Sequence, residues 1–481
     1  MNRAKMETHN AKVRVRFAPS PTGKLHLGNA RTAIFNMLFS LHYSGKFVLR
    51  IEDTDLERSA RLYEKRLIET LHWLGIDWDE GPDIGGDYGP YRQSERLEIY
   101  RPYIERLVKE GKAYYCYCTQ RELEEERREL LLRGLPPRYS GRCRYLTERE
   151  RRRFEAEGRR PTIRFLVPDE TIKFFDLIKG EMRFEGAAIG DFIIVRSSGV
   201  PAYNLAVVID DALMEITHVI RGEDHLSNTP CQLFLYKALG LKPPKFAHHP
   251  LLLGPDRTKL SKRHGDVSVE EYREKGFLPE ALLNYLVITG TVLEREREIF
   301  SREEMIKLFK LEKLSKSNAI FDLSKLKWMN RHYLRILPLE DILNCLRPFL
   351  KEEEFKKLEE NPKIIGAILE NVETLLDIPG FLDIFLKKGL SYTEEARDII
   401  RQKGAKEVID LFYQYIVANK HKDLMGILDE IILETGFKKR KVMMPIRAAI
   451  TGSTVGPELK KIFELLPKEW IVDRLIKAKG I

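Results

Sequence analysis

The sequence lacks the features that would place it among membrane, secreted or disordered proteins. No apolar run approaches the ~18–20 residues that span a bilayer, and the N-terminal MNRAKMETHN has no apolar signal region. Five cysteines in 481 residues are an odd number and too few for a disulfide scaffold. No low-complexity tract is present. These absences predict a cytoplasmic protein with no membrane partner, and the length suggests about three to four domains.

The chain has fewer acidic than basic residues. Lys and Arg number 82 against 73 Asp and Glu, so the formal net charge is +9 and the isoelectric point is about 9.0. A basic excess of this size suggests an anionic partner such as a nucleic acid. A solubilising charged surface explains it equally well, and composition leaves both explanations open.

The first fifty residues predict the start of a nucleotide-binding fold. KVRVRFAPS (12–20) reads as a strand, and NARTAIFNMLFSLHYSG (29–45) places Ala30, Ala33, Ile34, Met37, Leu38 and Leu41 on one helical face. KFVLRIED (46–53) predicts the next strand. A strand, a loop, a helix and a strand in this order are typical of doubly wound folds.

The loop between the first strand and the helix matches neither common phosphate-binding fingerprint, G-x-G-x-x-G or G-x-x-x-x-G-K-[ST]. Its distinctive feature is HLGN (26–29), just before the helix. Gly28 leaves room for a ligand near the backbone, and the helix start offers free N–H groups to phosphate. A purely structural role for His26 is the alternative, because short motifs often match by chance.

The order and spacing of several longer motifs resemble those of bacterial-type glutamyl-tRNA synthetases of class I. The motifs are RFAPSPTGKLHLGNARTAIFN, FVLRIEDTD, YRQSERLEIY (91–100), PAYNLAVVIDDALMEITHVIRGEDHLSNTP (201–230), HHPLLLGPDRTKLSKRHGD (248–266) and MPIRAAITGSTVGPEL (444–459). The resemblance runs almost from end to end of the chain.

This resemblance implies an α/β fold: a doubly wound, Rossmann-like catalytic domain with an α+β insert, followed by an all-helical C-terminal half. The expected parts are the catalytic fold's first half (1–115), an acceptor-end-binding insert (116–200), the catalytic second half (201–266), a stem-contact helical domain (267–335) and a helical anticodon-binding domain (336–481). Amphipathic patterns from about residue 267 onward agree, and the related glutaminyl enzymes carry β-barrels there instead.

The resemblance also implies a reaction. L-glutamate and ATP form glutamyl-adenylate, with Mg²⁺ on the phosphates, and the glutamyl group passes to the 3′ end of tRNA(Glu), also or instead tRNA(Gln), on a monomeric enzyme. The implied catalytic residues are His26, Lys259 and Lys262. The implied glutamate contacts are Arg16, Ala18, Ser20, Glu52, Tyr203 and Arg221. The implied ATP contacts are Thr22, Gly28, Asp224, Leu252, Lys259, Leu260, Ser261, Lys262 and Arg263.

These residue types suit their implied tasks. The planar guanidinium of arginine bonds a carboxylate bidentately, and Glu52 matches the amino group of the substrate. Glutamine would leave an arginine unpaired and should be rejected for that reason. His225 stands where some relatives have Trp, so the resemblance assigns no role to this position.

Two stretches contain Lys-Leu-Ser-Lys, and only one can contact a triphosphate. TKLSKRHG (258–265) matches the second ATP signature of the resembling family, and it lies between Gly254 and Gly265, where a loop can close. LEKLSKS (311–317) continues a helical pattern, so we expect Ser315 or Ser317 to cap a helix there.

The predicted insert contains a candidate metal site. Some members of the resembling family bind zinc through C-x-C and a later cysteine, and the matching positions are Cys116, Cys118 and Cys143, with Tyr145 as fourth ligand. Three idle or buried thiols are the alternative, and zinc is left open. The insert also holds 13 Arg and 9 Glu between residues 120 and 160, which suits contact with RNA phosphates or a solvated face.

Two other functions remain as alternatives. An RNA-binding paralogue without catalysis is disfavoured because His26, Lys262, Glu52 and Arg16 are all present. A nucleotidylyltransferase with a small acceptor is disfavoured by the KLSKR loop and the helical C-terminal half. The sequence leaves open which tRNA is charged.

Overall fold

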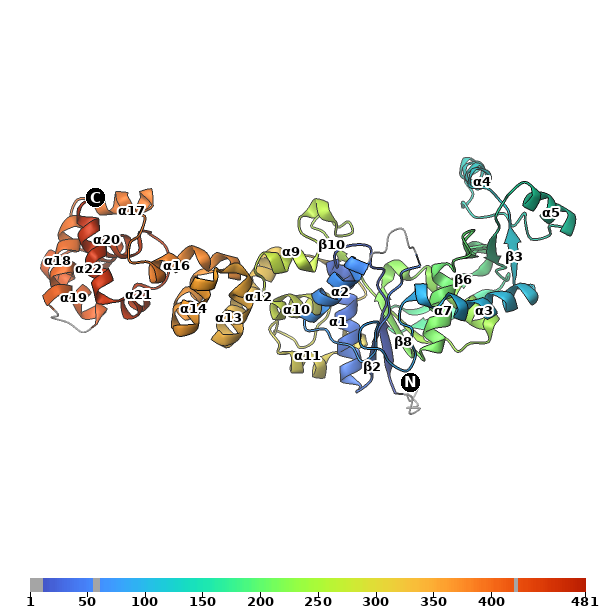
Figure 1. Cartoon of the computed structure of the whole chain (residues 1–481), viewed down its shortest axis with the longest axis horizontal. Helices are drawn as coiled ribbons and strands as arrows, with labels where there is room; N and C mark the ends of the chain where they lie inside the picture. Colours follow the sequence, from blue (N-terminus) through green and yellow to red (C-terminus); the bar gives the residue numbers. More distant parts are fainter. Residues whose placement is uncertain (1–11, 55–60, 419–422) are drawn as a thin grey trace. The chain divides into compact units, whose positions relative to one another are not determined.

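The computed structural model describes residues 12–54, 61–418 and 423–481. By its packing the chain divides into two units (Figure 1): Met1–Glu271 with Leu283–Phe321, and Tyr272–Leu282 with Asp322–Ile481. Every helix in the described ranges is too short or too polar to cross a lipid bilayer.

The first unit is built on parallel strands, as its sequence pattern predicts. Strand β1 (Arg14–Phe17) pairs in parallel with β2 (Lys46–Leu49), and helix α1 (Leu27–His42) connects them. Strand β8 (His218–Gly222) pairs in parallel with β9 (Lys245–His249). The N–H of Thr217 donates to the carbonyl of Arg14 (2.9 Å), which brings the start of β8 beside β1. The predicted strand, loop, helix and strand are therefore confirmed.

Helix α1 buries the predicted apolar face with one exception. Ala30, Ala33, Ile34 and Leu38 are fully buried, whereas Leu41 is 45% exposed. Leu41 lies in the last helical turn, beyond the part of the helix that packs on the sheet, so its predicted burial is wrong. Gly45 follows the helix because a Cβ there would lie 2.4 Å from the carbonyl oxygen of Val13.

The insert contributes strands to two sheets. Strands β3 (Ala113–Cys116), β4 (Thr162–Phe165) and β7 (Ile193–Val195) form an antiparallel sheet. The hairpin of β5 (Thr171–Asp176) and β6 (Gly180–Glu185) extends the sheet that contains β8 and β9, and the strand order is β6-β5-β9-β8. The helices of this region and its surroundings are α2 (Arg61–Trp73), α3 (Leu97–Lys109), α4 (Gln120–Leu132), α5 (Glu148–Ala156), α6 (Gly186–Ile189), α7 (Tyr203–Leu213) and α8 (Asn228–Leu239).

The second Lys-Leu-Ser-Lys stretch does not continue a helix into another helix. After α9 (Val269–Glu274), α10 (Pro279–Ile288) and α11 (Arg302–Leu308), residues Leu311–Lys313 form a 3-10 turn, and β11 (Ala319–Ile320) pairs with β10 (Leu252–Leu253). The predicted capping by Ser315 or Ser317 is wrong. Asp322 caps α12 (Leu323–Ile336) instead, because its carboxylate accepts from the N–H groups of Ser324 and Lys325.

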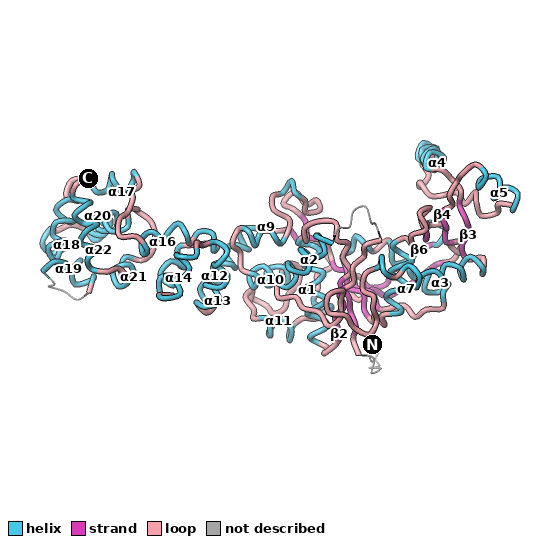
Figure 2. The backbone as a smooth tube through the Cα atoms, in the orientation of Figure 1, coloured by secondary structure: helices cyan, strands magenta, loops and turns pink. Residues whose placement is uncertain are grey.

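From α12 onward the described residues form helices and no strands, as predicted for the C-terminal half (Figure 2). Arg474 anchors this helical unit from within: buried, it donates to the carbonyl groups of Ile384, Lys387 and Ile450. The helices after α12 are α13 (Leu339–Leu346), α14 (Glu352–Glu360), α15 (Lys363–Ile368), α16 (Pro379–Leu386), α17 (Glu394–Arg401), α18 (Ala405–Ala418), α19 (Leu424–Thr435), α20 (Lys439–Thr451), α21 (Leu459–Leu465) and α22 (Lys468–Lys479).

Candidate active site

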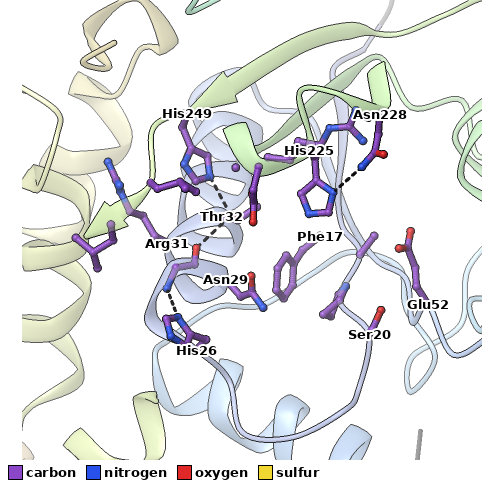
Figure 3. Close-up of a pocket in the computed structure, with 18 of the residues that line it drawn as sticks. Phe17, Ser20, His26, Asn29, Arg31, Thr32, Glu52, His225, Asn228 and His249 are labelled. Carbon is purple, nitrogen blue, oxygen red and sulfur yellow. Dashed lines mark hydrogen bonds between the residues drawn. The ribbon is translucent and has the colours of Figure 1, made fainter. Parts of the chain in front are cut away.

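A cavity of about 610 Å³ opens at the carboxyl ends of β1, β8 and β9 (Figure 3). Ligands bind at this edge in open α/β sheets. Many of the predicted site residues line it: Arg16, Ala18, Ser20, Thr22, His26, Gly28, Glu52, Tyr203, Arg221, Asp224, Leu252 and Lys259. Segments that are up to about 240 residues apart in sequence thus meet around one space.

The remaining predicted ATP contacts lie just outside this lining. Leu260 is buried, and its N–H donates to the carbonyl of Leu252 (3.3 Å). The N–H of Ser261 donates to His264 Nδ1 (3.1 Å), and Arg263 pairs with Asp256 (3.2 Å). Lys262 begins the 3-10 turn Lys262–His264, and its side chain lies outside what the structure describes.

One end of the cavity holds a buried network of charged side chains. Arg16 Nε donates to Asp211 Oδ1 (3.1 Å), and Arg50 Nη1 donates to the same oxygen (2.7 Å). Arg50 Nη2 also donates to Glu52 Oε1 (3.2 Å). Because Asp211 contacts Arg16 only through Nε, the two Nη groups of Arg16 have no protein partner among the described hydrogen bonds and remain for a ligand.

Glu52 has an unusual protonation equilibrium for a carboxyl group. Burial raises its pKa to about 7, although the guanidinium groups of Arg50 and Arg16 act in the opposite direction. By contrast, Arg16 and Arg50 overcome burial at Asp211 and hold its pKa below the ordinary value. The carboxylate of Asp211, which contacts Arg16, is therefore ionised, whereas Glu52, which lines the cavity, titrates near neutral pH.

Arg221 also lines this cavity. Its guanidinium donates to Thr229 Oγ1 (2.9 Å), Gln232 Oε1 (2.9 Å), His248 Nε2 (3.1 Å) and, more weakly, Tyr203 Oη (3.4 Å). All of these partners are neutral groups, and burial lowers the pKa of Arg221. Its positive charge therefore faces the cavity without a contacting carboxylate in the part of the chain that the structure describes.

The other end of the cavity is the N-terminus of α1. His26 is the N-cap of the helix, and its Nδ1 accepts from the N–H of Gly28 (3.3 Å). Burial lowers the pKa of His26, with Lys259 acting in the same direction. No acidic residue occupies the first turn of α1. This arrangement presents helix N–H groups and an imidazole to an anion.

Lys259 reaches the cavity from the loop after β10. Its ammonium Nζ contacts Asp224 Oδ2 (2.8 Å), and both side chains are substantially exposed. LEKLSKS contributes no residue to the described lining of this cavity. Its Lys316 offers only a backbone carbonyl, which accepts from Lys179 Nζ (2.9 Å).

The sequence reasoning missed several residues that line the cavity. His249 Nε2 contacts Thr32 Oγ1 (2.9 Å), and Arg31 Nη1 donates to the carbonyl of Pro250 (3.2 Å). Burial lowers the pKa of His249 to about 3, with Arg31 acting in the same direction. Asn29 is the last residue of HLGN, and Arg31 and Thr32 follow it in the first turns of the same helix, so their proximity to that motif was the signal that could have identified them. Among the residues concerned are Asn29, Arg31, Thr32, Asn228 and His249.

The predicted cysteine cluster forms, but with a different tyrosine. The sulfur atoms of Cys116, Cys118 and Cys143 lie within 4.8 Å of one another. Tyr145 is 89% exposed, so its prediction as fourth ligand is wrong. Tyr139 Oη instead lies 3.4 Å from Cys116 Sγ and 3.6 Å from Cys118 Sγ. Tyr139 Oη also accepts from the N–H of Cys143 (3.0 Å), whereas Tyr145 ends a turn over residues 142–145.

Comparisons with known proteins agree with this site. The family described as "tRNA synthetases class I (E and Q), catalytic domain" matches residues 12–328, and an anticodon binding domain matches residues 341–479. A glutamate–tRNA ligase 2 from Syntrophus aciditrophicus (strain SB) is 52% identical over 98% of both chains. A glutamate–tRNA ligase from Carboxydothermus hydrogenoformans is 50% identical over 94% of this chain and 97% of that protein.

A solved structure extends the likeness to three dimensions. The crystal structure of a glutamate tRNA ligase from Elizabethkingia meningosepticum, in complex with its amino acid, superposes with a TM-score of 0.85. It is 35% identical and covers 98% of this chain and 99% of its own.

Proposed function

This chain belongs to the glutamate–tRNA ligases, class I tRNA synthetases that use ATP, and we propose that it activates L-glutamate in the cavity at the ends of β1, β8 and β9. Glutamate and tRNA are its substrates. One observation supports this location most strongly. Two buried arginines, Arg16 and Arg221, face the same cavity as a buried carboxyl group, Glu52, and the N-terminus of α1.

The charges at one end of the cavity suit glutamate. We assign the substrate carboxylates to Arg16 and Arg221, whose guanidinium groups retain donors, and the substrate ammonium to Glu52. Tyr203 is positioned to add a hydroxyl contact, and Ala18 and Ser20 form the adjoining loop. Glutamine would leave a buried guanidinium without its anion, which is a costly arrangement.

The other end suits a triphosphate. His26, with Thr22 and Gly28 beside the helix start, would stabilise the negative charge on the phosphates, and Lys259 and Lys262 would do so from their loop. Leu260, Ser261 and Arg263 belong to the same loop, while Asp224 and Leu252 line the side toward the adenosine. Mg²⁺ on the phosphate oxygens would need few protein ligands.

Two transfers follow from this arrangement. A carboxylate oxygen of glutamate attacks the α-phosphorus of ATP, glutamyl-adenylate forms, and pyrophosphate leaves. The terminal ribose hydroxyl of the tRNA then attacks the activated carbonyl carbon, and AMP leaves. The side chains named here act by positioning and by charge stabilisation, without a covalent enzyme intermediate.

The identity of the tRNA is the part of the function that needs a direct assay. We propose tRNA(Glu) as the main acceptor, with tRNA(Gln) as a second or alternative one, and a monomer as the active form. Purified tRNA(Glu) and tRNA(Gln) should be tested separately with ATP and labelled glutamate. Glutamylation of tRNA(Glu) alone supports a discriminating enzyme. Charging of neither by folded protein would contradict the proposal and favour an RNA-binding paralogue.

The parts of the chain carry these tasks in our proposal as follows. Residues 1–115 and 201–266 form the catalytic fold, 116–200 receive the acceptor end, 267–335 contact the stem, and 336–481 read the anticodon. The match of an anticodon binding domain to residues 341–479 supports the last assignment.

We further propose a zinc ion in the insert, bound by Cys116, Cys118, Cys143 and the hydroxyl of Tyr139. The fit is supported by three sulfur atoms and one oxygen gathered around one point, and by Arg142 Nε, which donates to Cys118 Sγ (3.2 Å) and so favours a thiolate. Zinc would supply a structural cross-link between the two ends of this segment.

Metal analysis of the purified chain tests this site. We expect about one zinc per chain, and we expect Cys143→Ser to lose it. Tyr139→Phe should lower the affinity, whereas Tyr145→Phe, the matched control on the exposed tyrosine, should not. Wild-type protein that binds no zinc when the metal is supplied would contradict the proposal.

A further inference from the structure

Two residues that the sequence did not identify, His248 and Asp176, form a chain of hydrogen bonds that ends at Arg221. His248 lies directly beside it, because Arg221 and His248 are register partners on the parallel strands β8 and β9. Asp176 ends β5, the strand of the insert that pairs with the outer edge of β9. Asp176 and His248 are both fully buried, and neither lines the cavity.

The two carboxylate oxygens of Asp176 have different main hydrogen-bond partners. Oδ1 accepts from the N–H groups of Ile178 (2.9 Å) and Lys179 (2.8 Å). Oδ2 lies 2.6 Å from His248 Nδ1. Burial acts to raise the pKa of Asp176, but the hydrogen bonds from His248 and from these backbone groups outweigh it and leave the pKa below its ordinary value. The group is therefore a carboxylate, which can only accept.

This carboxylate selects one tautomer of His248. Since Oδ2 of Asp176 accepts, Nδ1 of His248 must carry the proton. Burial lowers the pKa of His248, so the imidazole is neutral and Nε2 has a free lone pair. That lone pair faces the Nε–H of Arg221 at 3.1 Å and the hydroxyl of Thr229 at 3.1 Å.

The other contacts complete a consistent network of donors. Arg221 Nη2 donates to Thr229 Oγ1 and Gln232 Oε1, so the hydroxyl proton of Thr229 is available for His248 Nε2. The amide of Gln232 is oriented in turn by Asn204, which accepts from its Nε2 (3.1 Å). Arg221 thus uses both of its Nη2 protons and its Nε proton on neutral acceptors. Nη1, whose described contact is the weaker one to Tyr203 Oη (3.4 Å), is the nitrogen left for a ligand.

We propose that Asp176 and His248 are positioning residues for Arg221: the carboxylate holds the imidazole in the tautomer that accepts the Nε–H of Arg221. This proposal rests on the assignment of Arg221 to a substrate carboxylate. A carboxylate in the place of His248 would also orient the guanidinium, but it would neutralise the charge that attracts the substrate. A neutral acceptor orients Arg221 and leaves that charge to glutamate.

The replacement Asp176→Asn tests the tautomer directly. The asparagine oxygen stays at the Oδ1 position, because an NH2 group there would face the backbone N–H groups of Ile178, Lys179 and His248. An NH2 group at the Oδ2 position faces the backbone N–H of His248 alone (3.2 Å). The asparagine NH2 group then faces His248 Nδ1, which must become the acceptor, and the ring proton moves to Nε2. Two donors, His248 Nε2–H and Arg221 Nε–H, then oppose each other. We expect the KM for glutamate to rise about 10- to 100-fold, with the KM for ATP within about twofold.

The replacement His248→Gln provides the rescue. A glutamine amide oxygen near the former Nε2 accepts from Arg221 whatever Asp176 offers. We expect a KM for glutamate within about threefold of wild type, and Asp176→Asn should add no further loss in that background. His248→Leu, which has no acceptor, should raise the KM as Asp176→Asn does. His218→Gln, on a half-buried histidine at the start of β8, is the matched control and should leave the KM unchanged.

All variants are measured in the full-length chain by glutamylation, with melting temperatures alongside. An equal loss from Asp176→Asn in the wild-type and His248→Gln backgrounds would overturn the proposal, as would an equal rise in the KM for ATP. If Asp176→Asn does not fold, His248→Leu against His248→Gln decides the question. Arg221→Lys distinguishes failure of the positioning role from failure of the proposed glutamate contact. If it leaves the KM for glutamate unchanged, the assignment of Arg221 to a substrate carboxylate is wrong. If it raises this KM while Asp176→Asn and His248→Leu do not, only the positioning role is wrong.

Discussion

Glutamate use by this chain should depend on pH because of Glu52. Burial raises the pKa of this carboxyl group to about 7. Only the ionised form pairs with the substrate ammonium, so binding is retained above pH 7 and lost as the pH falls through it. A group with this pKa is ionised in roughly one molecule in eleven at pH 6 and in about ten of eleven at pH 8. The expected change in kcat/KM for glutamate between these values is therefore about tenfold.

The assay is steady-state glutamylation at saturating ATP and tRNA, with glutamate varied at each pH. The quantity kcat/KM is chosen because it reports ionisations of the free enzyme. The histidines that line the cavity do not confuse the measurement, because burial lowers the pKa of His225 to about 4 and that of His249 to about 3, and the pKa of His26 also lies below its ordinary value.

The variant Glu52→Gln serves as the control. It keeps the shape of the side chain but cannot ionise, so its kcat/KM should be low and should not change between pH 6 and 8. At pH 8 the loss should be about 10- to 100-fold, the value of one charge-assisted hydrogen bond. A wild-type profile that is flat in this range would refute the reasoning, and so would a Glu52→Gln profile with the same slope as wild type.

Three further predictions concern the phosphate loop, the buried carboxyl group and the charge network. Lys262→Ala should lower the rate of ATP–pyrophosphate exchange about 100-fold or more. Lys316→Ala, in the other Lys-Leu-Ser-Lys stretch, should leave this rate within about twofold of wild type. The reverse pattern would mean that LEKLSKS, not TKLSKRHG, contacts the triphosphate. Glu52→Gln should melt at a higher temperature than wild type at pH 8. Folding raises the pKa of Glu52 from 4.5 to about 7, so the wild-type protein loses stability as the pH rises from about 4.5 to about 7, and the loss is complete at pH 8. An unchanged melting temperature would contradict this. Asp210→Ala should lower the free energy of unfolding by about 3–5 kcal/mol in denaturant titrations. The change removes the buried carboxylate that accepts from Arg96 Nε (2.7 Å) and Tyr100 Oη (2.9 Å). A loss below about 1 kcal/mol would mean that solvent replaces the carboxylate.

Local patterns in the sequence were sufficient for the secondary structure around the site. The alternation in residues 12–20 and the helical spacing after HLGN depend on neighbours within a few residues, and β1, α1 and β2 form where these patterns predict them. The exceptions lie at helix ends and in residues 311–320, where a 3-10 turn and β11 replace the predicted continuation of a helix. Leu41 is exposed because its turn of α1 extends beyond the packed region, and Asp322 rather than a serine caps α12.

The motifs of the chain also identified much of the cavity before its shape was known. Arg16, Glu52 and Arg221 were found because they match family positions, not because anything in their local sequence marks them as neighbours. Their meeting at one sheet edge depends on the parallel pairing of β1 with β2 and of β8 with β9. Parallel strands bring their carboxyl ends to the same edge, which is why positions distant in sequence share the cavity.

Tertiary structure alone decided three features. Tyr139 rather than Tyr145 joins the thiols, because the folded segment places the hydroxyl of Tyr139 beside Cys116 and leaves Tyr145 in solvent. The pKa of Glu52 depends on burial, which no local pattern reports. The contact of Asp176 with His248 exists because β5 of the insert pairs with β9 of the catalytic sheet. Sequence periodicity thus determined the elements, and the long-range pairing of strands determined which side chains act together.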